Sequence, residues 1–289
     1  MHFTFRRLGL AFFALLVVLL LLGVTYQGIA TAFERRDYPP PGHLADVGGH
    51  QLHLHCTGKG GSSVVLEAPE ASLSVHWTLV QDALTSHMRV CSYDRAGLGW
   101  SESGGQRFDP ARVPDELHAA LTREHVPAPY ILVGQSMGAA LVRLYAGRFP
   151  SDVQGLVLLD DPLSGDSATA TERAVALGRT LRVAPWLART GALRLSRLFH
   201  APEPDMPADA AGALASFMLR PDHLTRASHE LASWHDIIAL ARATDLSSTL
   251  PVTRIRTGQP DANHVPTRQP GAHAVAAATQ ALADALRSR

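Results

Sequence analysis

The sequence predicts an α/β fold: a mostly parallel central sheet with helices on both faces, preceded by a transmembrane helix. Short apolar runs typical of buried strands alternate along the chain with stretches of helical spacing. This alternation is typical of parallel sheets, in which helices form the crossover connections. The chain has 289 residues, of which 46% are hydrophobic, and this is enough for one sizeable core.

The N-terminal segment differs from the rest of the chain. Residues 8–26, LGLAFFALLVVLLLLGVTY, carry no charge and stand between Arg6-Arg7 and Arg35-Arg36. A helix needs about 20 apolar residues to cross a bilayer, whereas the apolar part of a signal peptide has about 7 to 15. We therefore expect residues 1–37 to anchor the chain in a membrane, with the following domain outside the cytoplasm. The alternative is a long signal peptide cleaved after Ala32, which would release a secreted domain.

The charge balance bears on the partners. The chain has 26 basic and 26 acidic residues, with no long run of one sign. Nucleic-acid-binding domains carry a basic patch or stripe, so we expect no nucleic-acid partner. The two cysteines do not have the spacing of a metal site, and we expect no metal ion.

The core is expected to combine residues 38–161 with residues 246–289. Strands are expected at 51–56, 62–68, 88–94, 130–134, 153–160 and 250–258. Helices are expected at 75–87, 113–125, 137–149 and 274–288. In QLHLHC, the alternation puts His53 and His55 on one face, which is typical of a half-solvated strand. A metal pair is the alternative there, but no third ligand stands nearby.

Residues 162–245 interrupt this alternation. They contain helical stretches broken by glycine and proline, and no convincing strand. An insertion of this kind after a sheet strand predicts a helical lid over the strand ends.

A nucleophile motif follows the strand expected at 130–134. Ser136 stands in Gly134-Gln135-Ser136-Met137-Gly138, directly before an expected helix. In the G-x-S-x-G pattern the serine occupies a strained turn, and small neighbours let the strand and the helix approach closely. The pattern in this context predicts that Ser136 is an exposed nucleophile rather than a structural turn residue.

With this motif the sequence resembles the α/β-hydrolase superfamily of serine hydrolases and esterases. RVCSYDRAGLGWSESG is similar to the fourth strand of that family and the loop after it. VVLEA with VHW is similar to its third strand and oxyanion loop, and VQGLVLLDD to its sixth strand. The resemblance covers residues 47–161, resumes at 250 and leaves the lid uncovered. It also makes the strands of Cys56 and Cys91 neighbours, so that a disulfide is feasible; otherwise both are buried thiols.

The resemblance implies a Ser-His-Asp triad in which Ser136 needs a base and an acid. The family places its histidine just before the last helix, which favours His273, with His264 as the alternative. Its acid follows the seventh strand or, in some members, the sixth. Only 15 residues separate Gly258 from His273, which predicts a trimmed C-terminal sheet edge without the usual eighth strand. We therefore expect Asp160, at the end of the sixth strand, to be the acid. The alternative acids are Asp261 and Asp161.

The oxyanion hole is the place where the chain departs from the family. Met137 follows the nucleophile and supplies one N–H group. The family favours glycines in the second donor loop, whereas this chain has Pro69-Glu70-Ala71-Ser72. Because Pro69 has no N–H, Glu70 is expected to supply the second donor. The Glu70 carboxylate could instead bind substrate or repel an anion.

These residues predict a serine hydrolase that cleaves carboxylic esters or related acyl compounds and needs no cofactor. A serine at position 136 argues against the dehalogenase and epoxide-hydrolase branches, which use aspartate there. The apolar lid and the anchor favour a small hydrophobic ester as substrate. The alternative is a binding protein that kept the fold but lost catalysis.

Overall fold

The structure is a computed structural model, and it describes residues 2–105, 107–164, 167–196, 205–256 and 269–288. A seven-stranded sheet lies at its centre, in the order β1-β2-β4-β3-β5-β6-β7. The strands are β1 (His43–Asp46), β2 (Gln51–Thr57), β3 (Ser63–Glu67), β4 (Arg89–Tyr93), β5 (Tyr130–Gln135), β6 (Val153–Leu159) and β7 (Val252–Ile255). The pairs from β4 to β7 are parallel, and β1 and β2 are antiparallel additions at one edge. The predicted mostly parallel sheet is confirmed, and β1 is a short edge strand that the sequence pattern did not indicate.

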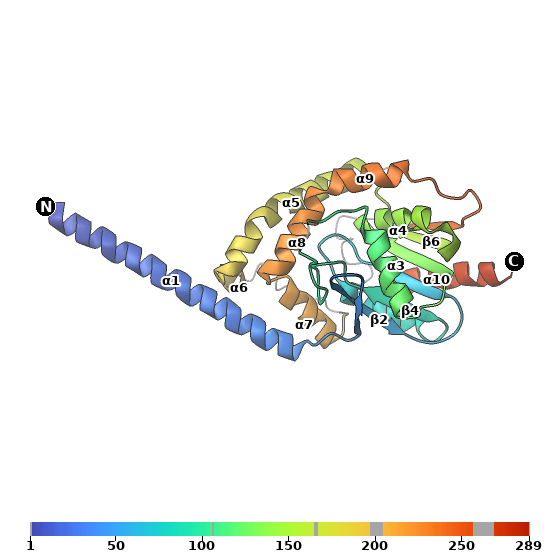
Figure 1. Ribbon diagram of the computed structural model, residues 1–289, viewed down its shortest axis with the longest axis horizontal. Coiled ribbons are helices and arrows are strands. Elements are labelled where there is room, and N and C mark those ends of the chain that lie inside the picture. The colour runs from blue at the N-terminus through green and yellow to red at the C-terminus, as the bar shows by residue number, and fades with distance from the viewer. Residues whose placement is uncertain (1, 106, 165–166, 197–204, 257–268, 289) are drawn as a thin grey trace.

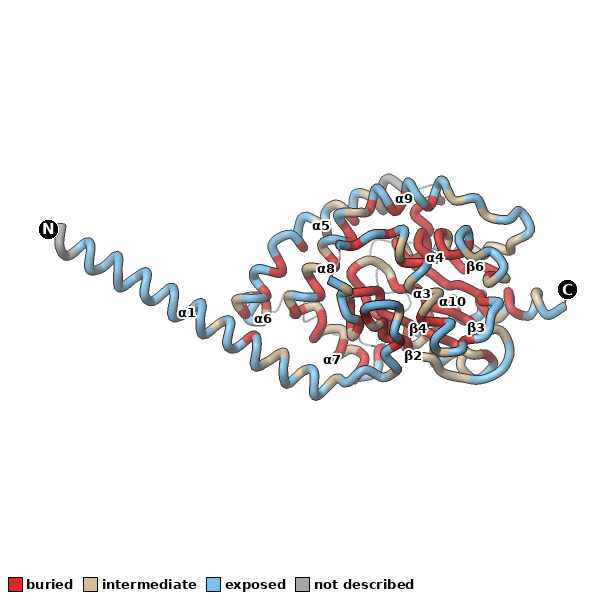
Figure 2. Tube along the Cα trace, viewed as in Figure 1, coloured by how far each residue is buried: buried red, intermediate tan, exposed pale blue. Residues whose placement is uncertain are grey.

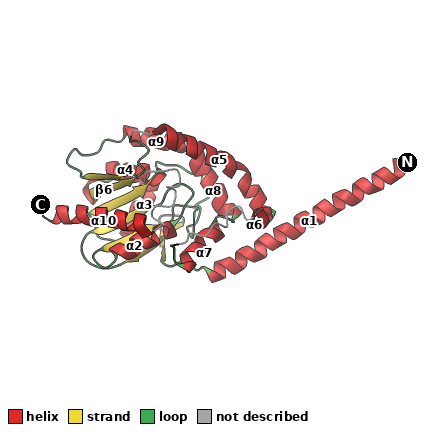
Figure 3. Cartoon of the chain, turned by 180° about the vertical axis from the view of Figure 1, so that it is seen from behind, coloured by secondary structure: helices red, strands yellow, loops and turns green. Residues whose placement is uncertain are grey.

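Helices cover both faces of the sheet (Figure 1). The helices α3 (Val113–Arg123) and α4 (Met137–Arg148) pack on one face, against residues such as Leu132. The short 3₁₀ segment Ser74–Trp77, α2 (Thr78–Leu84) and α10 (Gln269–Arg287) pack on the other face, against residues such as Val133. Figure 3 shows α2 and α10 together over the sheet. Successive side chains of a strand point to opposite faces, so β5 is buried on both sides.

The lid lies between β6 and β7, and its described residues form helices joined by turns, with no strand. Its helices are α5 (Ser167–Arg189), α6 (Ala192–Ser196), α7 (Ala208–Phe217), α8 (Pro221–Ala232) and α9 (Trp234–Ala243). Buried lid residues, including Leu231 and Trp234, form one cluster with Met137 and Leu141 of α4. The lid is therefore packed on the end of the sheet that carries the G-x-S-x-G turn.

The N-terminal helix α1 (His2–Asp37) extends away from this body (Figure 1). It is the one helix among the described residues that is long and apolar enough to cross a membrane. Its most apolar window is not buried at all, and Figure 2 shows most of the helix as exposed. Only its C-terminal part reaches the lid.

The C-terminal edge is shortened, as the sequence predicted. β7 has four residues, and no eighth strand occurs in the described part of the chain. α10 begins at Gln269, five residues before the expected start at 274. This earlier start places His273 inside the helix instead of in the loop before it.

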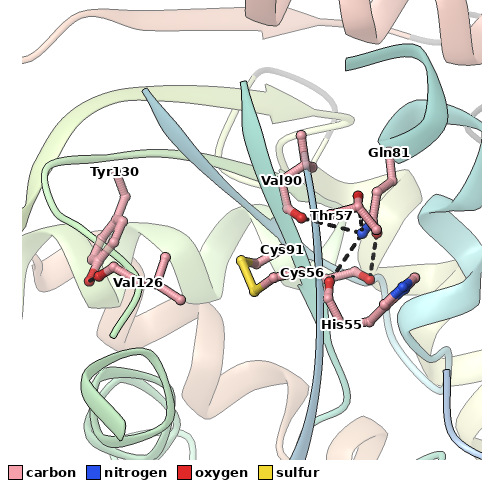
Figure 4. The surroundings of a disulfide bond; sticks show 9 residues. His55, Cys56, Thr57, Gln81, Val90, Cys91, Val126 and Tyr130 are labelled. Atoms are coloured by element: carbon pink, nitrogen blue, oxygen red, sulfur yellow. Dashed lines mark hydrogen bonds between the residues drawn. A yellow bond between two sulfur atoms is a disulfide. The ribbon is translucent and has the colours of Figure 1, made fainter. Parts of the chain in front are cut away.

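The β2 strand corrects one expectation and confirms another. His53 is fully buried, because β4, the Ser74–Trp77 segment and Trp100 cover it, and its Nδ1 lies 3.0 Å from Asp94 Oδ2. The expected half-solvated strand is therefore wrong at His53, whereas His55 is partly exposed. Cys56 lies directly opposite Cys91 on β4, and the two form a disulfide (Figure 4). Gln81 of α2 also binds this part of β2, donating from Nε2 to the Thr57 hydroxyl at 2.9 Å (Figure 4).

Candidate active site

The turn between β5 and α4 is built by close backbone approach. Ser136 has φ 51° and ψ −116°, a strained backbone for a residue with a side chain. A Cβ at Gly138 would lie 2.5 Å from the Glu67 carbonyl oxygen, and one at Gly134 would lie 2.4 Å from the Gly138 oxygen. Only glycine fits at these two positions. The G-x-S-x-G spacing therefore produces the strand–turn–helix geometry that lifts a serine out of the sheet.

Backbone strain gathers around this turn. Among the described residues other than glycine, φ is positive at Ala71, His125, Ser136 and Asp160. Ser136 and Asp160 directly follow β5 and β6, and Ala71 stands four residues beyond the end of β3. These three strands are neighbours in the sheet, and open α/β sheets bind ligands outside the carboxyl ends of their strands. Strain of this kind clusters at functional sites because the surrounding structure must enforce it.

The expected oxyanion donors lie together, but in an unexpected arrangement. The Met137 N–H at the start of α4 donates to Glu70 Oε2 at 3.3 Å. The Glu70 carboxylate therefore lies where an oxyanion would accept from Met137. The Glu70 N–H has no hydrogen-bond partner in the described part of the chain. The 67–71 loop thus contains the expected donor and also a competing acceptor.

Asp160 lies beside the nucleophile turn. Its N–H donates to the Ile255 carbonyl at 2.9 Å, and its Oδ2 accepts from Gln135 Nε2 at 3.3 Å. The Ser136 N–H donates to the Leu159 carbonyl at 3.0 Å, which fixes the end of β6 against the turn. Asp160 therefore stands on the strand next to Ser136, as expected for an acid after the sixth strand.

Asp161 has a different environment. Its buried carboxylate accepts from the Leu163 N–H at 3.0 Å and from Arg254 Nε at 3.3 Å. These contacts hold the segment that follows β6 against Arg254 of β7. Asp161 is therefore engaged in structural contacts with Leu163 and Arg254.

A buried histidine joins the site without having been expected from the sequence. His76 Nε2 lies 2.8 Å from Gln135 Oε1, so Gln135 connects His76 to Asp160. The VHW segment pointed to the loop that carries this residue. No local pattern distinguishes His76 from the other 14 histidines, because the hydrogen-bond partner Gln135 comes from β5.

The expected base is the residue that the geometry supports least. His273 is exposed on α10, and no hydrogen bond joins it to Ser136 among the described residues. His264 and Asp261 lie outside the described residues. No group of three or more His, Cys, Asp or Glu in the described part of the chain is placed to hold a metal ion.

A buried ionic cluster holds the 67–71 loop in place. Arg95 donates to Glu67 Oε1 at 2.6 Å and to Glu230 Oε1 at 2.7 Å, and the Tyr93 hydroxyl also donates to Glu67. Arg95 further donates to the carbonyls of Ala68 and Pro69, at 2.7 and 2.9 Å. Burial raises the pKa of the Glu67 carboxyl. Burial alone would lower the pKa of Arg95, but the carboxylates of Glu230 and Glu67 outweigh it and raise that pKa.

The lid contacts the same loop through two residues of α8. Glu230 Oε2 accepts from the Ala71 N–H at 3.4 Å. His223 Nδ1 accepts from the Gly99 N–H at 3.2 Å, and its Nε2 lies 3.1 Å from the Ala71 carbonyl oxygen. Since Nδ1 accepts, the proton is on Nε2, and His223 is neutral. The lid therefore helps to define the loop that carries the expected second oxyanion donor.

A cleft of about 1010 Å³ lies elsewhere, between α1, α7, α8 and the 97–105 loop. Trp100, Phe217 and His223 line it, whereas Ser136, Met137, Glu70, Asp160 and His273 do not. This cleft is therefore not the space around the nucleophile turn.

The fold agrees with a comparison against protein families. A model of the alpha/beta hydrolase fold family matches residues 55–219, more than half of the chain. The chain therefore belongs to the α/β-hydrolase fold family, and the resemblance predicted from its motifs is confirmed.

Curated relatives match parts of the chain. An uncharacterized protein of Schizosaccharomyces pombe is 30% identical over 188 residues, which are 54% of this chain and 34% of that protein. Pyrrolizixenacetamide deacetylase of Xenorhabdus hominickii is 30% identical over 118 residues, which are 41% of this chain and 44% of the deacetylase. The chain thus spans less than half the length of either relative.

Solved structures share the architecture over more of the chain. Epoxide hydrolase CorEH matches with a TM-score of 0.65 and 17% identity, covering 84% of this chain and 98% of that enzyme. At this level of identity, the similarity shows a common fold, and the chemistry must be argued from the residues at the site.

Proposed function

We propose that the protein hydrolyses carboxylic esters or related acyl compounds with Ser136 as nucleophile. The observation that carries the proposal is the positive φ of Ser136 between two glycines that the backbone geometry requires. A turn with only a structural role would be relaxed by glycine at this position. A strained serine at a helix start is instead suited to expose its hydroxyl beside the N–H of Met137.

The proposed reaction needs only protein groups and water. The Ser136 hydroxyl attacks the substrate carbonyl while a histidine takes its proton and then gives it to the leaving alcohol. The N–H groups of Met137 and Glu70 stabilise the oxyanion. Water then attacks the acyl-enzyme, the histidine again carries the proton, and the carboxylic acid leaves with Ser136 restored.

Asp160 is the proposed acid, because it directly follows β6, the strand next to Ser136, whereas Asp161 is held by Arg254 of β7. Asp261 stays the alternative. For the base we retain both histidines but now favour His264. α10 begins at Gln269, so His264 stands before the last helix, where the resemblance puts the base, whereas His273 is exposed within it.

Ser136 also bears on the choice of chemistry within the family. The epoxide-hydrolase and dehalogenase branches are expected to use aspartate at this position, and this chain has serine. The name of the Xenorhabdus relative, a deacetylase, describes removal of an acyl group and supports acyl transfer here. The helical lid with apolar residues favours a small hydrophobic ester as substrate.

We further propose that α1 anchors the protein in a membrane, with the remainder outside the cytoplasm. The disulfide between Cys56 and Cys91 supports an oxidising compartment. Arg194 of the lid binds Gln27 and Glu34 of α1, so α1 is part of the folded molecule. Cleavage after Ala32 would remove Gln27 from this contact, which argues against the secreted alternative.

The test uses the full chain in detergent, a fluorophosphonate probe and short p-nitrophenyl esters. Labelling and turnover should both vanish in Ser136→Ala. His264→Ala and His273→Ala, compared side by side, identify the base, and Asp160→Asn against Asp161→Asn and Asp261→Asn identifies the acid. A folded protein that neither labels nor turns over would contradict the proposal.

One observation favours a second candidate, a binding protein that has lost catalysis. The Glu70 carboxylate accepts from Met137 and would repel a developing oxyanion. If wild type and Glu70→Ala both fail to label while remaining folded, the binding protein becomes the better proposal.

A further inference from the structure

The end of the lid nearest α1 carries exposed apolar side chains. Val183, Trp186 and Leu187 of α5 are 56%, 68% and 42% exposed, and Leu195 of α6 is 76% exposed. The three α5 residues stand at i, i+3 and i+4, so they share one helix face. We call these four residues the lid tip. Single exposed apolar residues are ordinary on a protein surface, but a tryptophan beside three aliphatic residues at one end of a domain marks an interaction site.

The lid tip lies close to the point where the apolar part of α1 ends. Residues 8–26 are free of charge, and at 1.5 Å per residue they extend over about 28 Å, close to the thickness of a bilayer core. A Cβ at Gly23 would lie 2.1 Å from the Thr190 carbonyl oxygen, so α1 touches the α5–α6 turn directly. Gly23 is three residues from Tyr26. The α5–α6 turn therefore contacts α1 at a residue that lies less than one turn of the helix from the expected membrane surface.

Polar contacts mark the side of this surface that faces water. Arg194 of α6 donates from Nε to Gln27 Oε1 at 2.7 Å and from Nη2 to Glu34 Oε2 at 2.8 Å. Ser216 of α7 donates to the same Glu34 oxygen at 3.1 Å. These contacts hold the lid against the last three turns of α1. Figure 1 shows the consequence: α6 and the end of α5 next to it lie near α1, while α9 lies at the far end of the lid.

The charge of this part of the lid suits a lipid surface. Between residues 167 and 196 there are five arginines and a single acidic residue. The Arg189 guanidinium lies 5.0 Å from the centre of the Trp186 ring. Tryptophan and arginine are enriched where proteins meet lipid headgroups, because each combines apolar and polar contacts. Cationic side chains are also attracted to anionic headgroups.

We infer that the lid tip docks into the headgroup layer of the membrane that α1 crosses. The protein would then contact lipid at two places, through the anchor and through the lid. The occupant of the apolar surface is a lipid bilayer, since the α5–α6 turn beside it contacts α1 at Gly23, inside the uncharged segment that is expected to cross the membrane. This inference rests on the proposed anchoring and extends it to the lid.

The test measures the depth of a nitroxide label in the full chain, reconstituted in vesicles of phosphatidylcholine and phosphatidylglycerol. Cysteine is introduced at Val183 in the lid tip, at Phe13 in α1, or at Leu240, an exposed apolar residue of α9. Both natural cysteines are in the disulfide and do not take the label. Label depth is read by electron paramagnetic resonance from collisions with oxygen, which partitions into lipid, and with a water-soluble nickel chelate.

We expect the labels at Val183 and Phe13 to collide mainly with oxygen, because they lie in lipid. The label at Leu240 should collide mainly with the nickel chelate, because it lies in water. Trp186→Asp should raise nickel collisions at Val183 by at least about twofold, since aspartate is excluded from lipid, and leave Phe13 unchanged. A label at Val183 as accessible to nickel as that at Leu240 would overturn the inference, while Phe13 in lipid would leave the anchor standing. Phe13 in water would instead refute the anchor.

Discussion

The sheet side and the lid side of the candidate site are stabilised by different interactions. On the sheet side, Ser136 is fixed by apolar strands and by backbone approach at Gly134 and Gly138. On the lid side, Glu230 and His223 reach the 67–71 loop through buried charged and polar groups. The same site thus has one wall built from close packing and one built from directional contacts.

This difference determines how each wall responds to change. Apolar burial is non-directional and does not depend on pH. The sheet side should therefore keep its geometry as the pH changes. A buried ion pair is different, because the desolvation of both charges is offset only when every partner is in place. The lid side should therefore be sensitive to single substitutions of charged residues and to pH, whereas the sheet side should be sensitive to added volume.

The largest effect is expected for Arg95→Met. This change leaves the carboxylates of Glu67 and Glu230 buried without their cation. Removing one side of a buried ionic cluster costs about 3 to 5 kcal/mol of folding stability. The measurement is urea unfolding of the full chain in detergent, followed by tryptophan fluorescence.

Arg148→Met is the matched control for Arg95→Met. Arg148 pairs with Asp115, but their side chains are 65% and 51% exposed, and such pairs contribute less than about 1 kcal/mol. Equal losses in the two variants would mean that the ionic cluster does not hold the lid side together.

Gly138→Ala probes the sheet side and should have the next largest effect. The added Cβ would lie 2.5 Å from the Glu67 carbonyl oxygen, so α4 must move away from β3. Overpacking of this kind costs about 1 to 3 kcal/mol, and it displaces the Met137 N–H. We expect loss of ester hydrolysis with a smaller loss of stability than in Arg95→Met.

The control for Gly138→Ala is the same change at Gly178 in α5. A Cβ there would meet Leu231 at 3.5 Å, which is ordinary contact. Gly178→Ala should leave hydrolysis unchanged and stabilise the helix slightly. A Gly138→Ala protein with full activity would show that the G-x-S-x-G turn tolerates more side-chain volume than its geometry implies.

The sequence predicted the parts of the site that depend on neighbouring residues. The G-x-S-x-G turn at Ser136 follows from five consecutive residues, and the position of Asp160 beside it follows from the end of one strand. Glu230 and His223 could not be found this way, because they stand more than 150 residues after Ala71, the residue they contact. Nothing in the local pattern of α8 indicates which of its polar residues are buried.

The C-terminal segment shows a different limit of the sequence pattern. The amphipathic pattern of AVAAATQALADALRS predicted a helix from 274, but α10 starts at Gln269 and includes Pro270 in its first turn. Proline is well tolerated at the start of a helix, since it lacks only an N–H that has no partner there. Because the expected start at 274 lies after His273, the sequence placed His273 in the loop before the helix, whereas the structure has it within α10.

Glu70→Ala should change activity in the opposite direction to the other variants. It keeps the expected N–H donor but removes the carboxylate that accepts from Met137. If that contact competes with the oxyanion, kcat for p-nitrophenyl esters should rise, by up to about tenfold for 1.4 kcal/mol of released interaction. Glu102→Ala, an exposed carboxylate outside the site, serves as the control. A fall in kcat would mean that Glu70 assists catalysis or substrate binding.

The smallest effect concerns pH and arises at His223. Burial lowers the pKa of His223 below its ordinary value of 6.5, although the Ala71 carbonyl and the carboxylates of Asp222, Glu230 and Asp94 oppose this. The unfolded chain therefore takes up the proton first as the pH falls. The contribution of His223 to stability is complete above pH 6.5 and decreases as the pH drops below it.

His223→Gln should remove that part of the pH dependence. A glutamine can still accept from Gly99 and donate to Ala71, but it does not titrate. We expect the melting temperature of the wild type to fall more steeply than that of His223→Gln between pH 6.5 and 5, with the two curves parallel above pH 7. Parallel curves over the whole range would place the acid sensitivity elsewhere. A steeper slope in wild type would show that the lid is attached to the 67–71 loop through a neutral histidine, and that this attachment weakens in acid.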